Sequence, residues 1–497
     1  MNTSTLSPVE KAVETFENAG RMRLFSGEVI PLEMHKARIV QKINLLPTRE
    51  RVAAMQRAGN NTFLLRNDEV FLDMLTDSGV NAMSDMQQAA MMMADDSYAG
   101  SETFFRLESA LRDFFGMKHF LPAHQGRACE NILATGLIRP GQAAVMNYHF
   151  TTAKAHITRV GGRVIEVLAD SAMDATVVAP FKGDFDMEKL EAAFVAEGTE
   201  GIAFVRVEAG TNLIGGQPIS LGNMREVSAF CKARGLISVL DASLLSDNLY
   251  FMKTREALCA SMSTADIVRE LGELFDIIYF SGRKLGFARG GGICLKDDGL
   301  FDKLKVLVPL YEGFLTYGGM SVREMEAMRV GLAETLDMDV ISQTPQFVAA
   351  FSDELTRLGV PVVRPSGGLG CHIDASAFVP HIPSSQYPAA ALAAAVYIVS
   401  GARGMERGTL SEQRNTDGSE NPAQMELLRL AIPKRVFTLS HIKFAADRIG
   451  WLFRHRERIG GLRFVEEPET LRFFLGRLEQ IGGWQERLAE AFEGDMQ

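Results

Sequence analysis

The sequence predicts an α/β protein built on a mainly parallel sheet, and three observations support this. Between about residues 101 and 335, short β-branched and aromatic runs alternate with stretches of helical periodicity. Such alternation is typical of parallel strands covered by helices on both faces. Several polar residues come at or just after the ends of these runs, where open α/β sheets bind ligands. The last run leads into a glycine-rich turn that carries a lysine, Lys284.

The first 93 residues are expected to precede the sheet. Residues 1–45 are amphipathic without a strand pattern, which indicates an N-terminal extension or arm. Residues 49–93 are predicted to be mostly helical, with a turn at 75–79, where Thr, Asp, Ser and Gly cluster.

The predicted sheet follows. Its expected strands are 143–146, 163–167, 202–207, 236–240 and 277–280, and helices are expected at 224–234 and 267–274, among others. Beyond 341 the pattern becomes α+β, with a helix near 386–400, a polar linker at 411–422, a strand near 428–432 and a final helix at 484–492. We therefore predict a large domain at 84–337 and a smaller α+β domain formed by 46–83 with 338–497.

Composition limits the classes of partner. The chain has 497 residues, 46% of them hydrophobic and 23% charged, and a formal net charge of −10. No block of Lys and Arg stands out, so we expect neither a nucleic acid nor an anionic membrane as partner. The five cysteines are scattered without a CxxC pair, which favours a reducing compartment. The polar N-terminus and the lack of a long apolar run predict a cytoplasmic protein.

Lys284 is the first candidate for chemistry. It lies in the stretch IIYFSGRKLGFARGGG, residues 277–292. A lysine just past a buried strand is costly to desolvate, and burial lowers the pKa of its amine and makes it nucleophilic. Because a Schiff-base lysine needs that property, Lys284 is predicted to carry pyridoxal phosphate as an internal aldimine. The alternative is an Arg-Lys pair in a solvated loop.

Four more candidates lie along the same sheet. Residues 123–127, AHQGR, open a helix and suit a phosphate, unless they are an ordinary helix start with a surface arginine. Phe150 either stacks on a planar ring or belongs to the core. Asn212, which precedes a double glycine, either donates to a phenolate-type oxygen or forms a turn. Asp241 closes a hydrophobic run and either pairs with a pyridinium nitrogen or caps the next helix.

Taken in chain order, these candidates resemble the aspartate-aminotransferase-like (type I) pyridoxal-phosphate fold. The chain also resembles the tyrosine phenol-lyase/tryptophanase family of β-eliminating lyases over residues 47–477. The matching stretches are NTFLL (61–65), LTDSG-NAMSD (75–85), YAGSE (98–102), HQGR (124–127), FTT (150–152), GGQP (215–218), MERG (405–408), RL-IP (429–433) and LRFF (471–474). On these stretches the chain is identified as a member of that family.

The resemblance implies roles for the residues that match. Lys284 holds the cofactor, Phe150 stacks on its ring, Asn212 faces its phenolic oxygen and Asp241 faces its ring nitrogen. The implied phosphate ligands are Gln125, Gly126, Arg127 and Ser281. The implied substrate-binding residues are Arg429 for the carboxylate, with Thr76, Ser78, Met405 and Phe473. The implied catalytic residues are Lys284, Tyr98, which helps protonate the leaving group, and Arg407 with Thr151, which address a phenol hydroxyl.

Four positions resemble the tyrosine phenol-lyase branch rather than tryptophanase: Thr151, Met405, Arg407 and Phe473. The chain also departs from the family. Leu244 stands where the family has an arginine that neutralises the cofactor's phenolate oxygen, and Leu285 replaces an acidic residue. Arg289 replaces a neutral asparagine in the loop that contributes to the family's monovalent-cation site, together with Asp96. We expect the Arg289 guanidinium to pair with Asp96 in place of K⁺.

The resemblance implies a pyridoxal-phosphate-dependent β-eliminating lyase of aromatic amino acid catabolism. It would act on an aromatic L-amino acid to give pyruvate, ammonia and a phenol-type leaving group, and would form a homo-oligomer, either a dimer or a tetramer. Three alternatives remain at this stage. They are a lyase or synthase acting on another aromatic or sulfur amino acid, an aminotransferase or decarboxylase, and a cofactor-binding protein without activity.

Overall fold

The computed structural model describes residues 21–415 and 417–496, and these form two compact units. Unit 1 contains 78–172 and 179–342. Unit 2 contains 21–77, the short segment 173–178 and 343–496. We describe each unit by itself. The predicted division at 83/84 and 337/338 lies within a few residues of these boundaries, and it stays a prediction.

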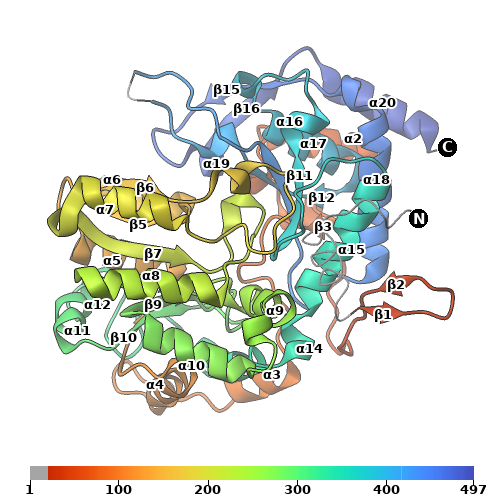
Figure 1. The fold of residues 1–497 in the computed structure, drawn as a ribbon. Helices are drawn as coiled ribbons and strands as arrows, with labels where there is room; N and C mark the ends of the chain where they lie inside the picture. The colour runs from red at the N-terminus through yellow and green to blue at the C-terminus, as the bar shows by residue number, and fades with distance from the viewer. Residues whose placement is uncertain (1–20, 416, 497) are drawn as a thin grey trace. The chain divides into compact units, whose positions relative to one another are not determined.

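Unit 1 is built around a seven-stranded sheet with the order β4-β10-β9-β8-β7-β5-β6 (Figure 1). The strands are β4 (His119–Ala123), β5 (Ala143–Met146), β6 (Arg163–Glu166), β7 (Ile202–Glu208), β8 (Ser238–Asp241), β9 (Ile277–Ser281) and β10 (Gly291–Leu295). Strands β5 to β9 are parallel and β10 is antiparallel to both of its neighbours. The five predicted strands and the mainly parallel sheet are therefore confirmed.

Two strands were missed in the sequence. The edge strand β4 contains Pro122, a residue that edge strands tolerate because one side of the ladder is unpaired. Strand β10 begins with Gly291 and Gly292, which composition assigned to a turn. At Gly292 a Cβ atom would lie 2.2 Å from the Phe120 ring, so only glycine fits beside β4.

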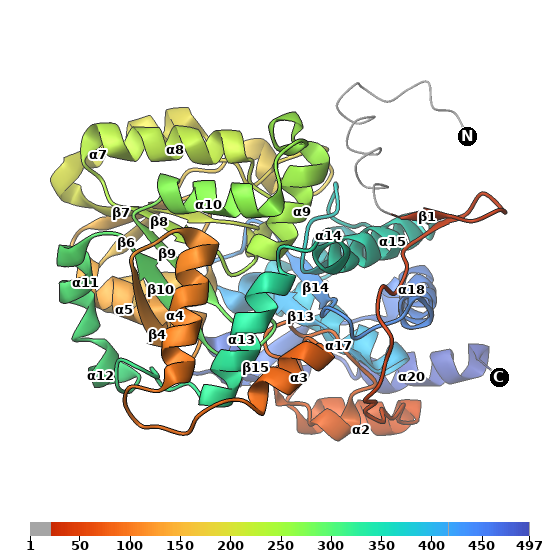
Figure 2. The same ribbon diagram turned by 90° about the horizontal axis from the view of Figure 1, so that it is seen from below.

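Successive residues of the central strands pack into two cores, one on each face of the sheet. On β9, for example, Ile278 and Phe280 lie in one core and Ile277 and Tyr279 in the other. The first core also takes residues from α4 (Glu102–Phe115), α8 (Leu221–Arg234), α10 (Thr264–Leu274) and α13 (Val322–Glu334). The second takes residues from α5 (Gly126–Leu137), α6 (Thr151–Arg159) and α11 (Asp298–Lys305). Figure 2 shows α8 and α10 side by side along the strands.

Unit 2 has an antiparallel sheet in the order β11 (Gly370–Asp374), β14 (Leu427–Ala431), β13 (Met405–Arg407). Its central helix α17 (Pro388–Ser400) is buried on every side. Alanines let α2 (Thr48–Arg57), α18 (Leu439–Arg454) and α20 (Trp484–Asp495) approach α17 closely. Helix α17 begins at a proline and ends at Gly401 with φ +72°, the left-handed conformation that ends many helices. In the part of the chain that the structure describes, no helix is long and apolar enough to cross a bilayer.

The remaining elements surround these two sheets. They are β1 (Met22–Arg23), β2 (Val29–Ile30), β3 (Leu72–Asp73), α3 (Asp85–Met91), α7 (Met187–Gly201), α9 (Leu245–Arg255), α12 (Val308–Tyr311), α14 (Met338–Ile341), α15 (Gln343–Arg357), α16 (Ala375–Phe378), β12 (Ala402–Arg403), β15 (Leu462–Glu466), α19 (Arg472–Leu475) and β16 (Arg477–Gln480).

The secondary structure of the N-terminal region differs from the predicted pattern in two places, while the extension itself stays a prediction. Within the predicted extension 1–45, of which 1–20 lie outside the described residues, β1 and β2 form a short hairpin. The stretch 49–93 holds only two α-helices, α2 and α3, joined by 3₁₀ turns and β3. Asn61 explains part of this, because its side-chain oxygen accepts from the Phe63 amide and thereby satisfies the backbone in a tight turn rather than an α-helix.

Candidate active site

A row of three polar side chains crosses the sheet of unit 1. Glu208 ends β7, Asp241 ends β8 and Tyr279 lies on β9. The register places Glu208 opposite Asp241, and Asp241 opposite Tyr279. Residues in register on neighbouring strands point to the same face, so the three side chains lie side by side with Asp241 in the middle. All three are buried.

Arg206 joins this row. Its Nη2 donates to Asp241 Oδ2 at 2.6 Å, its Nε to the Tyr279 hydroxyl at 2.8 Å and its Nη1 to Glu208 Oε2 at 3.3 Å. The Tyr279 hydroxyl in turn donates to Asp241 Oδ2 at 2.8 Å. Burial alone lowers the pKa of Arg206, but Tyr279, Asp241 and Glu208 together hold it well above its ordinary value. The guanidinium is therefore a fixed positive charge that ties three strands together.

The second oxygen of Asp241 accepts from the Ser243 amide at 3.0 Å. Helix α9 begins at Leu245 with Leu244 at its N-cap, so the interpretation of Asp241 as a helix cap is wrong. The Ser243 hydroxyl accepts from the Ser281 amide at 3.1 Å, and this bond links the end of β8 to the start of the lysine-bearing turn.

A third carboxyl group, that of Glu130 on α5, belongs to the same buried group. It accepts a hydrogen bond from the Thr152 hydroxyl. Burial raises the pKa of its carboxyl to about 7, although Arg206 and Thr152 act in the opposite direction. Sequence reasoning missed Glu130 and Arg206. A signal was present for Arg206, because two charged residues interrupt the apolar run of β7 and must be paired there.

The residues predicted to bind a phosphate lie near the start of α5. Its N-cap, Gln125, makes no side-chain capping hydrogen bond, so a ligand can satisfy the N–H groups of the first turn. At Gly126 a Cβ atom would lie 3.0 Å from the Ser281 Cβ, and at Gly291 one would lie 3.0 Å from the Gln125 carbonyl carbon. Gln125, Gly126 and Ser281 are thus brought together, with Arg127 exposed beside them.

Lys284 follows in a tight turn. The Lys284 and Leu285 amides both donate to the Ser281 carbonyl, and the Gly282 amide donates to the Gly290 carbonyl at 2.8 Å. The side chain of Lys284 is half-buried rather than enclosed, while Leu285 is fully buried. The turn therefore fixes the backbone of Lys284 just after β9, the strand that carries Tyr279 of the Asp241 row.

Three further predicted residues lie just after strands of the same sheet. Phe150 is half-buried at the N-cap of α6, and Thr151 is the buried first residue of that helix. Asn212 is buried, and its backbone N–H donates to Glu208 Oε1 at 3.1 Å. Asn212 is thus connected to the Asp241 row through Glu208.

Tyr98 and the expected cation pair are not brought to this row. The side chain of Tyr98 is 73% exposed and stacks on Phe314, with ring centroids 6.1 Å apart. Arg289 and Asp96 are both exposed, and among the described residues no ion pair joins them. The Arg289 amide instead donates to Glu324 Oε2 at 2.8 Å. The structure therefore shows no Arg289–Asp96 pair within the described chain, and the expected replacement of K⁺ by Arg289 stays a prediction.

Unit 2 gathers the predicted substrate residues around Arg429 on β14. Its Nη2 donates to the Leu75 carbonyl, next to Thr76, and also contacts the Met405 sulfur. Burial lowers the pKa of Arg429 to about 10, with Asp77 opposing the shift.

The residues around Arg429 complete this group. His372 lies opposite Arg429 on β11, and burial together with Arg429 lowers the pKa of His372 to about 3. The Arg407 guanidinium lies 5.8 Å from the centre of the Phe473 ring. This group therefore combines a desolvated cation for a carboxylate with a second cation beside an aromatic ring. Of the predicted substrate residues, Ser78 alone belongs to unit 1.

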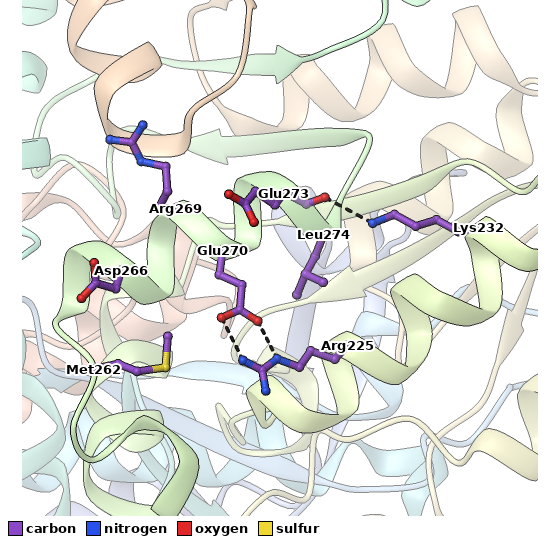
Figure 3. Close-up of a pocket in the computed structure, with 8 residues that line it drawn as sticks. All are labelled: Arg225, Lys232, Met262, Asp266, Arg269, Glu270, Glu273 and Leu274. Carbon is purple, nitrogen blue, oxygen red and sulfur yellow. Dashed lines mark hydrogen bonds and ion pairs between the residues drawn. The ribbon is translucent and has the colours of Figure 1, made fainter.

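A surface groove of about 560 Å³ lies between α8 and α10 (Figure 3). Arg225 pairs with Glu270 through two hydrogen bonds, and Lys232 donates to the Glu273 carbonyl. None of the predicted site residues lines this groove. Among the described residues there is also no group of three His, Cys, Asp or Glu side chains suited to a metal ion.

Comparison with known proteins identifies the family of this chain. A family model of β-eliminating lyases matches residues 73–448. The tyrosine phenol-lyase of Pasteurella multocida is 42% identical over 451 residues, which cover 90% of this chain and 98% of the relative. That of Symbiobacterium thermophilum is 41% identical over the same shares. The chain therefore belongs to the β-eliminating lyase family.

Solved structures with low identity share the fold. A serine palmitoyltransferase from S. paucimobilis with bound pyridoxal phosphate is 11% identical with a TM-score of 0.53, over 78% of this chain and 89% of the other. The Sphingomonas wittichii serine palmitoyltransferase is 13% identical with a TM-score of 0.53, over 78% and 88%. The predicted type I fold is confirmed, and with the family it makes the chain a pyridoxal-phosphate-dependent lyase.

Proposed function

We propose that this lyase cleaves an aromatic L-amino acid, with L-tyrosine as first candidate. Water and the amino acid would give pyruvate, ammonia and a phenol. The observation that carries the proposal is the buried Asp241 carboxylate at the end of β8. This strand pairs with β9, which leads into the turn that bears Lys284. The chain that holds it is 42% identical to a tyrosine phenol-lyase over nine-tenths of its length.

The residues present fit pyridoxal phosphate. The start of α5, Gly126 and Ser281 leave room for a phosphate where a Cβ would otherwise fill the space. Asp241 suits a protonated ring nitrogen, and the half-buried Lys284 amine suits covalent attachment. When bound, the cofactor supplies an electron sink for the pair left when the Cα proton is removed.

The chain's own residues then take separate tasks. The Lys284 amine removes the Cα proton, and Asp241 keeps the ring nitrogen protonated. Arg429 binds the substrate carboxylate through a guanidinium that burial has already desolvated. Arg407 and Thr151 address the phenol hydroxyl, and Tyr98 donates a proton to the departing carbon.

We also propose that the active form is a cytoplasmic homo-oligomer. The support is Tyr98, which is 73% exposed in the single chain, because a proton donor works best where water is excluded. A second copy covering Tyr98 and Phe314 would supply that exclusion. Light scattering combined with activity at increasing dilution tests this, because a monomer with full activity would contradict it.

The deciding experiment supplies purified protein and pyridoxal phosphate with L-tyrosine, L-tryptophan or an S-alkyl-L-cysteine, and measures pyruvate. We expect pyruvate and phenol in equal amounts from L-tyrosine, and neither from Lys284→Ala. Pyruvate from the S-alkyl cysteine alone would favour the second candidate, a lyase for a different leaving group. Leu244 is the observation that favours this second candidate, since the family's arginine is absent there. Keto-acid-dependent amino transfer would indicate an aminotransferase instead.

A further inference from the structure

The buried row around Asp241 contains more acid than base. Arg206 carries one positive charge and lies among the carboxyl groups of Asp241, Glu208 and Glu130. Burial raises the pKa of Glu208, although Arg206 opposes the shift, and it raises the pKa of Glu130 to about 7. Three buried carboxyl groups therefore share one guanidinium in this group.

We infer that Arg206 and Glu208 are positioning residues that set the negative charge at Asp241, so that a protonated ring nitrogen is the cation that completes the buried group. This inference rests on the proposed cofactor. It assigns a role to two residues outside the family motifs on which the resemblance was recognised.

Geometry connects Glu208 to the site in two directions. One oxygen accepts from Arg206 at 3.3 Å, and that arginine is bonded directly to Asp241 at 2.6 Å. The other oxygen accepts from the backbone N–H of Asn212, a predicted cofactor residue. Glu208 therefore acts on both ends of the predicted ring site through neighbours, without contacting the cofactor itself.

Stability alone does not explain this arrangement. Buried ion pairs often contribute no more than well-packed apolar residues of similar volume, because their desolvation is costly. A further carboxyl group beyond a single pair adds to that cost. Apolar side chains fill the other inward positions of β7, so Arg206 and Glu208 are exceptions within one strand. A cation that arrives with the cofactor offsets the cost only in the bound state.

The test measures binding to the apoprotein, without substrate. Two probes are titrated: pyridoxal phosphate, and its carbocyclic analogue in which C–H replaces the ring nitrogen. The two share the phosphate and aldehyde, so the ratio of their dissociation constants isolates the ring-nitrogen contribution. We expect the wild type to prefer pyridoxal phosphate and Glu208→Gln to reduce that preference about tenfold. Arg206→Gln, which removes the competing cation, should increase the preference.

Asp184→Asn is the matched control, because Asp184 is another largely buried carboxyl of unit 1 whose partner is Ser220. It should leave the ratio unchanged. A purely structural role for Glu208 would weaken both probes equally and would overturn the inference, as would an unchanged ratio in Glu208→Gln. If Arg206→Gln does not fold, the Glu208→Gln ratio still decides. A wild type that binds neither probe would instead refute the proposed cofactor.

Discussion

Glu130 makes the stability of the apoprotein depend on pH in a direction that the structure fixes. Its carboxyl is buried on α5 and faces Arg206 and Asp241 on the sheet, Thr152 on α6 and the nearby Arg127. Burial raises its pKa from 4.5 to about 7. In the unfolded chain the carboxyl ionises near its ordinary pKa, so the unfolded state loses this proton first as pH rises.

The sign and size follow from linkage. A raised folded-state pKa gives stability that is fully present below about pH 4.5 and is lost as pH rises to about 7. A shift of about 2.5 pKa units corresponds to roughly 3 kcal/mol at 1.36 kcal/mol per unit. Glu130→Gln keeps the shape and removes the ionisation. We therefore expect the variant to gain up to about 3 kcal/mol over the wild type between pH 5 and pH 8.

Urea denaturation of the apoprotein at pH 5, 6, 7 and 8 measures this difference. Using the variant-minus-wild-type difference at each pH cancels the contribution of other buried acids such as Asp184 and Glu426, whose pKa values burial also raises to about 7. Glu191→Gln, on the exposed side of α7, is the control and should change stability by less than about 0.5 kcal/mol. A difference for Glu130→Gln that does not vary with pH, or that shrinks as pH rises, would refute the reasoning.

Three further outcomes are expected. Gly126→Ala should raise the dissociation constant of pyridoxal phosphate at least tenfold, because the alanine Cβ would lie 3.0 Å from the Ser281 Cβ. Circular dichroism should show an intact fold. Unchanged binding would place the phosphate elsewhere. Arg429→Lys should raise KM for the amino acid roughly tenfold or more with a smaller change in kcat, since lysine lacks the planar guanidinium that binds a carboxylate through two hydrogen bonds. An unchanged KM would exclude Arg429 from substrate binding. Replacing K⁺ by Na⁺ should alter activity less than twofold, because Arg283 and Arg289 already bring positive charge to this loop, and steep K⁺ activation would contradict this.

The sequence was informative where strands are apolar and their ends are not. The five parallel strands are short and mainly apolar runs, and the ends of β8 and β9 lead to Asp241 and Lys284 as expected. Strands β4 and β10 were missed because a proline and two glycines hide their pattern, and only packing against each other makes them strands. Local composition cannot show such pairing, since it depends on contacts far apart in the sequence.

The same limit applies to the site. Strand ends pointed to Asp241 and Asn212, and the resemblance added Ser281. Neither pointed to Arg206 or Glu208, whose importance comes from register across three strands. The Arg289–Asp96 pair is a similar case, because opposite charges at plausible positions in the sequence do not show whether two side chains on different loops meet. Pairing between distant residues is decided by the fold.

The charges beside the predicted cofactor site bear on the leaving-group preference. Leu244 is a buried apolar side chain that packs against Gly210, and the resemblance to the family implies an arginine facing the phenolate oxygen at this position. The buried Arg206 guanidinium lies at Asp241, on the side predicted to face the ring nitrogen. Low positive charge at one end and a fixed ion pair at the other are expected to change how electrons withdrawn from the substrate are distributed. Leaving-group preference depends on that distribution, so rates ranked across tyrosine, tryptophan and S-alkyl cysteines report on Leu244 and Arg206 more directly than overall identity does.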